Sequence, residues 1–176
     1  MFGNGAVGYR SSAHSWLATT PGRTPAKSHL DTAVARIRDA CPDAVISLSG
    51  RGLRVAAAGV GGFPVVLEQV DGTTTVWFQD CHYEIPDIND AIAWAIRALS
   101  AASRLRIDYV GAQVRSWSLE IKTPDGAWQS ALSGGYGMMP SWQKRRTLYL
   151  QNDLVVAGRD LRRHDLRLLA HVGSRH

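Results

Sequence analysis

The chain has 176 residues and a formal net charge of +5. Its length suits one domain that can bury a sizeable core without disulfides or metals. It contains no run of 18 apolar residues and no basic start followed by an apolar block, which argues against a membrane span and a secretory signal peptide. We therefore expect a cytoplasmic protein without membrane contact, in which Cys41 and Cys81 are reduced thiols.

The first part of the chain is expected to contain a flexible arm and a helix. Residues 1–27 are rich in Gly, Ser, Thr, Ala and Pro and show no sustained periodicity, which predicts a flexible N-terminal arm before a single domain at 28–176. Ser28 opens a helix-start pattern, and apolar residues at helical spacing follow it as far as Cys41. The first helix is therefore predicted at about 28–41.

Four strands are predicted next, at AVISLS, LRVAAAG, PVVLEQV and TTTVWFQD. Asp71 and Gly72 form the dipeptide that favours the positive φ angles of a two-residue hairpin turn. This turn fixes the register of the hairpin, with three expected pairs: Val65 with Phe78, Val66 with Trp77, and Leu67 with Val76. The aromatic segment is expected to stay extended as far as a break at Ile85 and Pro86.

A second helix is predicted at about 87–104, with Asp87 as its cap. Its apolar residues recur with helical spacing and form one stripe that suits packing on a sheet: Ile88, Ala91, Ile92, Ala95, Ile96 and Leu99. This helix should contribute more to the core than any other element, because burying one Ile or Leu side chain stabilises a protein by roughly 1.5–3 kcal/mol.

Another hairpin is predicted from LRIDYV and VRSWSLEIK. Matching their apolar faces gives four expected pairs: Arg104 with Glu120, Leu105 with Leu119, Ile107 with Trp117, and Asp108 with Ser116. A short strand, AWQSAL, and a last hairpin of RRTLYLQ and DLVVAG around Gln151 and Asn152 should follow. The expected fold is a single α+β domain, a mostly antiparallel sheet of several hairpins packed against two main helices, with a short basic C-terminal helix.

The positive charge lies in the later part of the chain. Residues 1–100 hold 8 basic and 9 acidic side chains, whereas residues 101–176 hold 12 basic and 6 acidic. Arginines can contact phosphates and neighbouring aromatic rings can stack on bases, so a binding surface for nucleic acid is predicted. Its expected members are Tyr136, Trp142, Lys144, Arg145, Arg146, Arg162, Arg163 and Arg167. The alternative is that the aromatic residues pack under their own loop while the arginines solvate the last helix.

Two patterns suggest a metal site, and each has a simpler interpretation. Asp108 with Glu120 and Lys122 has the form of a metal-dependent nuclease site. The predicted register, however, separates the two carboxylates by about 13 Å along the strand at ~3.4 Å per residue, which is too far to share an ion. The second pattern is one strand face with three alternating ionisable residues, which more simply forms a solvated strand end: Asp80, His82 and Glu84.

Nucleophilic catalysis is not supported by the positions of the cysteines. Cys81 and His82 are neighbours in an expected strand, so their side chains should point to opposite faces and cannot form a dyad. No catalytic residue, metal or cofactor is therefore predicted. The expected function is non-enzymatic binding of a polyanion, with nucleic acid as the first candidate. The alternatives are a protein-interaction module (an inhibitor, immunity-type or assembly component) that meets an acidic protein surface, and a small metal-dependent nuclease or other hydrolase.

Overall fold

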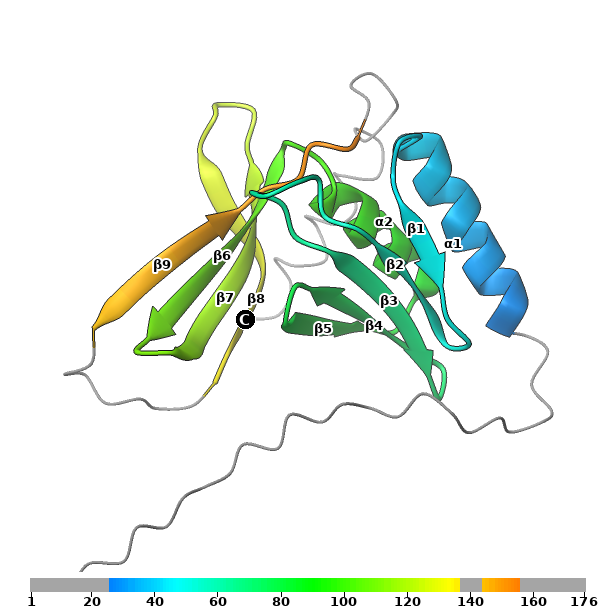
Figure 1. Ribbon diagram of the computed structural model, residues 1–176, viewed down its shortest axis with the longest axis horizontal. Coiled ribbons are helices and arrows are strands. Elements are labelled where there is room, and N and C mark those ends of the chain that lie inside the picture. The colour runs from blue at the N-terminus through cyan, green and yellow to red at the C-terminus, as the bar shows by residue number, and fades with distance from the viewer. Residues whose placement is uncertain (1–25, 137–143, 156–176) are drawn as a thin grey trace, which may run out of the picture.

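The computed structural model describes residues 26–136 and 144–155 (Figure 1). Within these residues the chain forms two helices and nine strands in two antiparallel sheets, which confirms the predicted α+β class. The predicted basic C-terminal helix lies outside the described residues, and so does the predicted N-terminal arm except for residues 26 and 27, which belong to the first helix. Neither described helix has the length and apolar character that spanning a membrane requires.

Helix α1, Ala26–Ala40, begins two residues before its predicted start. Its inner side buries Ala33 and Ile37 completely, and Cys41 follows directly in the core. The Cys41 N–H donates to the Ile37 carbonyl at 2.7 Å, so the helical hydrogen bonding reaches the residue before Pro42. Cys41 is thus a buried thiol, as its place on the apolar edge of the predicted helix indicated.

The first sheet is a meander in which each strand pairs with its neighbour in sequence (Figure 1). Asp71 and Gly72 turn the chain with φ angles of 51° and 88°, and the three predicted pairs across this hairpin are confirmed. Its strands, in spatial order, are β1 Ile46–Leu48, β2 Gly52–Val55, β3 Val65–Val70, β4 Thr73–Phe78 and β5 Cys81–Ile85.

Strand β5 corrects the expectation of one extended segment up to Ile85. The chain reverses at Gln79 and Asp80, and Cys81 pairs back with Phe78. Gln79 adopts a φ of 58°, a left-handed conformation that is uncommon outside glycine. No Gly or Pro marks this turn in the sequence, which is why the reversal was missed.

Helix α2, Ile88–Ala98, has the predicted cap but a different end. The Asp87 carboxylate accepts hydrogen bonds from the N–H groups of Asn89 at 2.7 Å and Asp90 at 3.1 Å. The predicted end at 104 is wrong, because the chain leaves the helix after Ala98. There the Ser100 hydroxyl donates to the Arg97 carbonyl at 2.7 Å and occupies an acceptor of the last turn.

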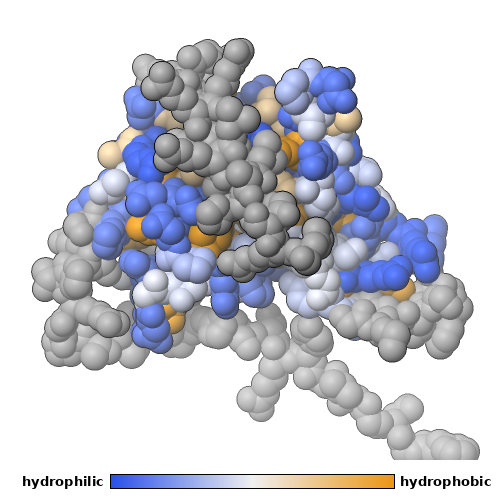
Figure 2. All heavy atoms as spheres, turned by 180° about the vertical axis from the view of Figure 1, so that it is seen from behind, coloured by the Kyte–Doolittle hydropathy of each residue, from blue (hydrophilic) through white to orange (hydrophobic). Residues whose placement is uncertain are grey.

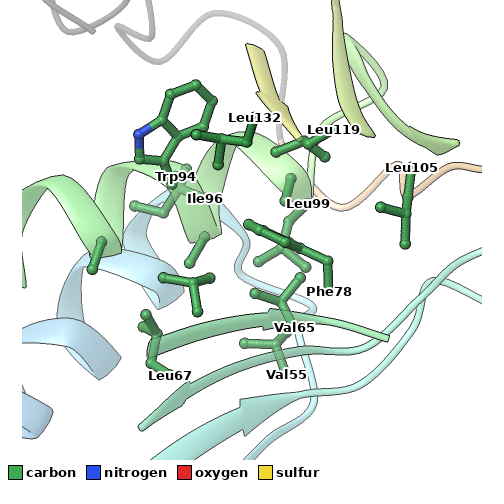
Figure 3. Packing of buried hydrophobic residues seen from close by; sticks show 14 of the residues in the cluster. Val55, Val65, Leu67, Phe78, Trp94, Ile96, Leu99, Leu105, Leu119 and Leu132 are labelled. Carbon is green, nitrogen blue, oxygen red and sulfur yellow. The ribbon is translucent and has the colours of Figure 1, made fainter. Parts of the chain in front are cut away.

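Helix α2 is buried on nearly every side, since residues outside the predicted stripe, such as Trp94 and Ala98, are buried as well. Burial also lowers the pKa of Arg97. Figure 3 shows that side chains from α2 and from both sheets share one core. The rings of Phe78 in the first sheet and Trp117 in the second lie 6.1 Å apart, so the two sheets meet directly.

The second sheet has the order β8-β7-β6-β9. All four predicted pairs between β6 and β7 are confirmed, from Arg104 with Glu120 to Asp108 with Ser116. A register shift follows at Asp108 and Tyr109. Its strands are β6 Ser103–Val110, β7 Gln113–Lys122, β8 Trp128–Gly135 and β9 Arg145–Leu150.

The predicted last hairpin is wrong in the part that the structure describes, because β9 pairs with β6 and residues 151–155 form no strand. Asn152 stands where that hairpin turn was expected, and its side chain is completely buried. It hydrogen-bonds to the backbone of Phe63 and Ala98. Through these contacts the segment after β9 packs against the loop before β3 and the end of α2.

Candidate polyanion interface

One end of the second sheet gathers cationic and aromatic residues from all four of its strands. Because neighbouring strands are antiparallel, β6 and β8 end where β7 and β9 begin (Figure 1). We call the residues at this place the basic end: Tyr109, Arg115, Tyr136, Lys144, Arg145 and Arg146. Tyr136 is 43% exposed, and the four cationic residues are exposed.

Backbone hydrogen bonds fix the ends of the outer strands. The Tyr136 N–H donates to the Arg115 carbonyl at 2.8 Å, just beyond β8. On the opposite edge of the sheet, the Gly111 N–H donates to the Lys144 carbonyl at 3.0 Å. Tyr136 and Lys144 are therefore held by the sheet itself, although they lie outside its strands.

Arg145 and Arg146 carry positive charge to opposite faces of the sheet. Arg146 pairs with Tyr109, and its guanidinium lies 4.7 Å from the centre of the Tyr109 ring, a cation–π contact. Arg145 pairs with Val110 and so belongs, by register, to the face that carries Asp108. The basic end can thus attract a polyanion from either side of the sheet.

No carboxylate interrupts these cations in the segments 109–115, 133–136 and 144–147. Four strands at about 4.8 Å spacing place the outer edges of the sheet about 14 Å apart. The Debye length is about 8 Å at physiological ionic strength, so the potentials of neighbouring cations on this sheet overlap. The four cations therefore reinforce one another at the basic end, and the adjoining carboxylate is that of Asp108, which is engaged by Arg106, Ser116 and Thr147.

A second surface lies beside the basic end, on the side of the second sheet that faces away from the core. Arg145 lies where the two surfaces meet. We call this second surface the polar face, and its members, identified by register and contacts, are Arg104, Arg106, Asp108, Ser116, Ser118, Glu120, Lys122, Trp128, Ser130, Ser133, Thr147 and Tyr149. Asp108 accepts hydrogen bonds from Ser116 at 3.3 Å and Thr147 at 2.7 Å. It also pairs with Arg106 at 3.2 Å, and this proximity raises the pKa of the arginine.

Arg104 occupies a slot between two aromatic rings of the polar face. Its guanidinium lies 4.3 Å from the ring centre of Trp128 and 4.4 Å from that of Tyr149. Its Nε donates to Glu120 at 2.6 Å. An aromatic, cationic and aromatic stack therefore runs across the sheet from β8 to β9, with a recessed carboxylate beneath it.

The structure brings together four residues of the predicted surface, Tyr136, Lys144, Arg145 and Arg146. The other predicted members lie outside the described residues: Trp142, Arg162, Arg163 and Arg167. Sequence reasoning missed Arg115. That residue stands alone in the sequence, and it joins Arg145 and Arg146 only because β9 pairs with β6.

Neither predicted metal pattern forms a site in the described parts of the chain, where no group of three or more potential metal ligands occurs. Asp108 faces Ser116 while Glu120 faces Arg104, so the predicted register is confirmed. Both carboxylates lie beside the Arg106 guanidinium, at 3.2 Å and 3.9 Å, which therefore occupies the space between them. Asp80 lies in the turn before β5, and the exposed ring of His82 lies 4.6 Å from the Trp77 ring.

Both cysteines are buried, free thiols. Cys81 is buried while His82 is exposed, as their adjacent positions in a strand predicted. Burial, with a smaller contribution from Asp80, raises the pKa of Cys81 to about 12. A thiol with so high a pKa is almost entirely protonated at neutral pH and is a poor nucleophile.

Exposed apolar side chains are scattered over the described surface. Val45 and Leu48 lie at β1, Val60 in a loop, and Val70 beside the Asp71 turn. Seen from behind in Figure 2, the described surface is mostly hydrophilic, with small separate apolar areas. Comparison with protein-family models, with curated proteins and with solved structures finds no match.

Proposed function

We propose that this protein is a non-enzymatic binding protein that engages nucleic acid through the basic end. One observation carries the proposal: four cationic side chains and two tyrosines share one end of a sheet, and the strand-end segments contain no carboxylate. Guanidinium and ammonium groups bind phosphates, while tyrosine rings stack on bases. The combination suits nucleic acid better than a small anion, because the cations come from two different strands, β7 and the edge strand β9, and have tyrosines beside them.

The surroundings of the acidic residues favour binding over hydrolysis. Glu120 is almost fully buried and pairs with Arg104, and Asp108 is engaged by Arg106 and two hydroxyls. A carboxylate in such a network would have to leave its partners before it could ligate a metal ion. These acidic side chains therefore suit the positioning of arginines better than catalysis.

A direct test is fluorescence anisotropy with labelled oligonucleotides of mixed sequence between 50 and 200 mM salt. Each phosphate neutralised on a single strand contributes about −0.7 to the slope of log affinity against log salt, so four contacts give a slope near −3. The double variant Arg145→Glu with Arg146→Glu should lose binding. Its control, Arg51→Glu with Arg54→Glu, makes the same charge change at two exposed arginines of the β1–β2 region and should still bind.

Binding that is absent in the unmodified protein, or that does not weaken with salt, would overturn the proposal. Equal loss in the two double variants would show that only overall charge matters and would also count against the basic end. An acidic protein partner is the contrasting outcome, and it would appear as binding to an acidic polypeptide such as polyglutamate without binding to any oligonucleotide.

A further inference from the structure

We infer that the nucleic acid is single-stranded and that it runs from the basic end across the polar face of the second sheet, where one base stacks on Tyr149. This inference rests on the proposed function and specifies which form of nucleic acid the site accepts. The polar face is distinct from the basic end. The two surfaces meet at Arg145, which belongs to the basic end and lies by register on the polar face.

The polar face is turned away from the core. The core side of the same strands carries Leu105, Ile107 and Leu119, which are buried among residues of α2 and the first sheet. On the polar face Tyr149 is 50% exposed, and the side chain of Arg106 is 42% exposed. Solvent therefore reaches the polar face along β6 and β9, whereas on the other side it reaches residues near the strand ends, such as Arg146 and Leu148.

Tyr149 is positioned in advance for stacking. One side of its ring is covered by the guanidinium of Arg104, which Trp128 covers in turn and Glu120 holds by an ion pair. A ring fixed in this way loses little conformational freedom when a ligand arrives. Its exposed side offers a flat aromatic surface, the kind of platform on which proteins stack unpaired bases.

The charges on this face are layered. The carboxylates of Glu120 and Asp108 are 9% and 27% exposed, whereas Arg106, which lies between them, is 42% exposed. The acidic groups are therefore less exposed than Arg106, with which they pair, and the exposed Lys122 adds a second positive charge to this face. A phosphate that approaches from solvent meets the positive group first.

The geometry favours a single strand over a duplex. Bases in a duplex are stacked on their own neighbours, so they cannot lie on a ring that belongs to a sheet surface. Tyr149 lies four residues along β9 from Arg145, about 14 Å at ~3.4 Å per residue. A short extended strand can thus place phosphates at the basic end and a base on Tyr149. Between Arg145 and Tyr149, the β9 residue on this face is Thr147, whose hydroxyl donates to Asp108.

The test compares a mixed-sequence single strand with the duplex of the same sequence at one salt concentration. The single strand should bind at least about tenfold more tightly, and Tyr149→Ala should weaken its binding by about tenfold, as expected for one lost stacking contact. Tyr149→Phe keeps the ring and should bind nearly normally. Tyr83→Ala removes a tyrosine of similar exposure, 38%, from the first sheet and is the matched control.

Salt dependence separates the role of the ring from the role of the charge. Tyr149→Ala should leave the salt slope unchanged, whereas Arg106→Gln should reduce it by about 0.7. Photo-crosslinking of a bromouracil-substituted oligonucleotide to the unmodified protein gives a second readout that needs no variant. The crosslinked peptide should contain Tyr149, and this decides the matter if Tyr149→Ala does not fold.

The two proposals fail in different ways. Equal binding of duplex and single strand, unchanged binding by Tyr149→Ala, or crosslinks confined to the first sheet would overturn the inference. The proposed function would still stand if Arg145→Glu with Arg146→Glu abolished that binding. Absence of binding to either form of nucleic acid would overturn both.

Discussion

The side chain of Asn152 pairs with both backbone polar groups of Phe63. The Phe63 N–H donates to Asn152 Oδ1 at 3.1 Å, and Asn152 Nδ2 donates to the Phe63 carbonyl at 2.9 Å. The same amide accepts from the Ala58 N–H and donates to the Ala98 carbonyl, both at 3.2 Å. One buried side chain thus joins the loop before β3, the end of α2 and the segment after β9.

Replacing this amide should destabilise the domain. Asn152→Ala is expected to lower the free energy of unfolding by about 2–4 kcal/mol, because buried polar groups left without a partner cost about 1–3 kcal/mol each. Urea denaturation measures the change. Asp153→Ala, at the exposed neighbouring position, is the control and should change stability by less than about 0.5 kcal/mol. Similar behaviour of the two variants would show that the Asn152 contacts contribute little.

Adjacent glycines give a second test of the same junction. A Cβ added at Gly62 would lie 2.5 Å from Asn152 Oδ1 and 2.7 Å from the Ala58 nitrogen, whereas one at Gly61 would meet nothing within 4 Å. Gly62→Ala should therefore cost about 1–3 kcal/mol through overpacking. Gly61→Ala should be nearly neutral, and thermal unfolding of the two variants side by side would reveal the difference. A neutral Gly62→Ala would mean that the loop yields without cost.

Helix α2 allows a comparison between its buried and exposed sides. Ile92 is 1% exposed, so Ile92→Asp should prevent folding by placing a charge in the core. Asn89→Asp introduces the same side chain at an exposed position in the first turn, where Arg36 lies 3.2 Å from Asn89 and the helix end favours negative charge. Circular dichroism should show a cooperative transition only for Asn89→Asp. A folded Ile92→Asp would contradict the burial of α2.

The two buried thiols should make the free energy of unfolding depend on pH in the alkaline range. Burial raises the pKa of Cys41 from 9.0 to about 11, and that of Cys81 to about 12. The folded state therefore holds these protons more tightly than the unfolded chain does. Their contribution to stability should be complete below about pH 9 and should be lost as the pH rises toward 11 and 12.

Denaturation at pH 8 and pH 10 would measure this loss. The double variant Cys41→Ala with Cys81→Ala is the control, since other groups also titrate in this range, and its stability should fall less between the two values. An equal fall in both proteins would show that the thiols do not contribute.

Alternation and turn chemistry made much of the fold predictable. The hairpin around Asp71 has the predicted register because its turn needs two residues with positive φ angles, and Asp71 and Gly72 are residue types that adopt them. The pairing of β6 with β7 was predictable for a different reason, since a slip by one residue would move Leu105 and Ile107 out of the core. Local pattern is sufficient where a single register buries the apolar side chains.

The errors arose where local pattern does not decide. The turn at Gln79 uses a left-handed residue without glycine, and the end of α2 depends on a serine hydroxyl that competes for a helix carbonyl. The partner of β9 lies in β6, about 40 residues earlier, as the contact of Thr147 with Asp108 shows. The local sequence pattern of a strand does not show which distant strand it pairs with.

The candidate site was only partly predictable for the same reason. Lys144, Arg145 and Arg146 are contiguous and conspicuous in the sequence. Arg115 joins them only because β7 begins at the sheet end where β9 also begins. The stack of Arg104 between Trp128 and Tyr149 draws on three separate strands, so no spacing rule could have indicated it.

The separation of Asn152 from Phe63, 89 residues along the chain, has a consequence for the order of folding. The first sheet pairs strands that are neighbours in sequence, and these close short loops at small entropic cost. The Asn152 contacts close a much longer loop and need both sheets in place, so they should form after the transition state. Stopped-flow measurements on Asn152→Ala should then show faster unfolding with nearly unchanged refolding. The Asn152 contacts would thus slow unfolding and prolong the lifetime of the native state.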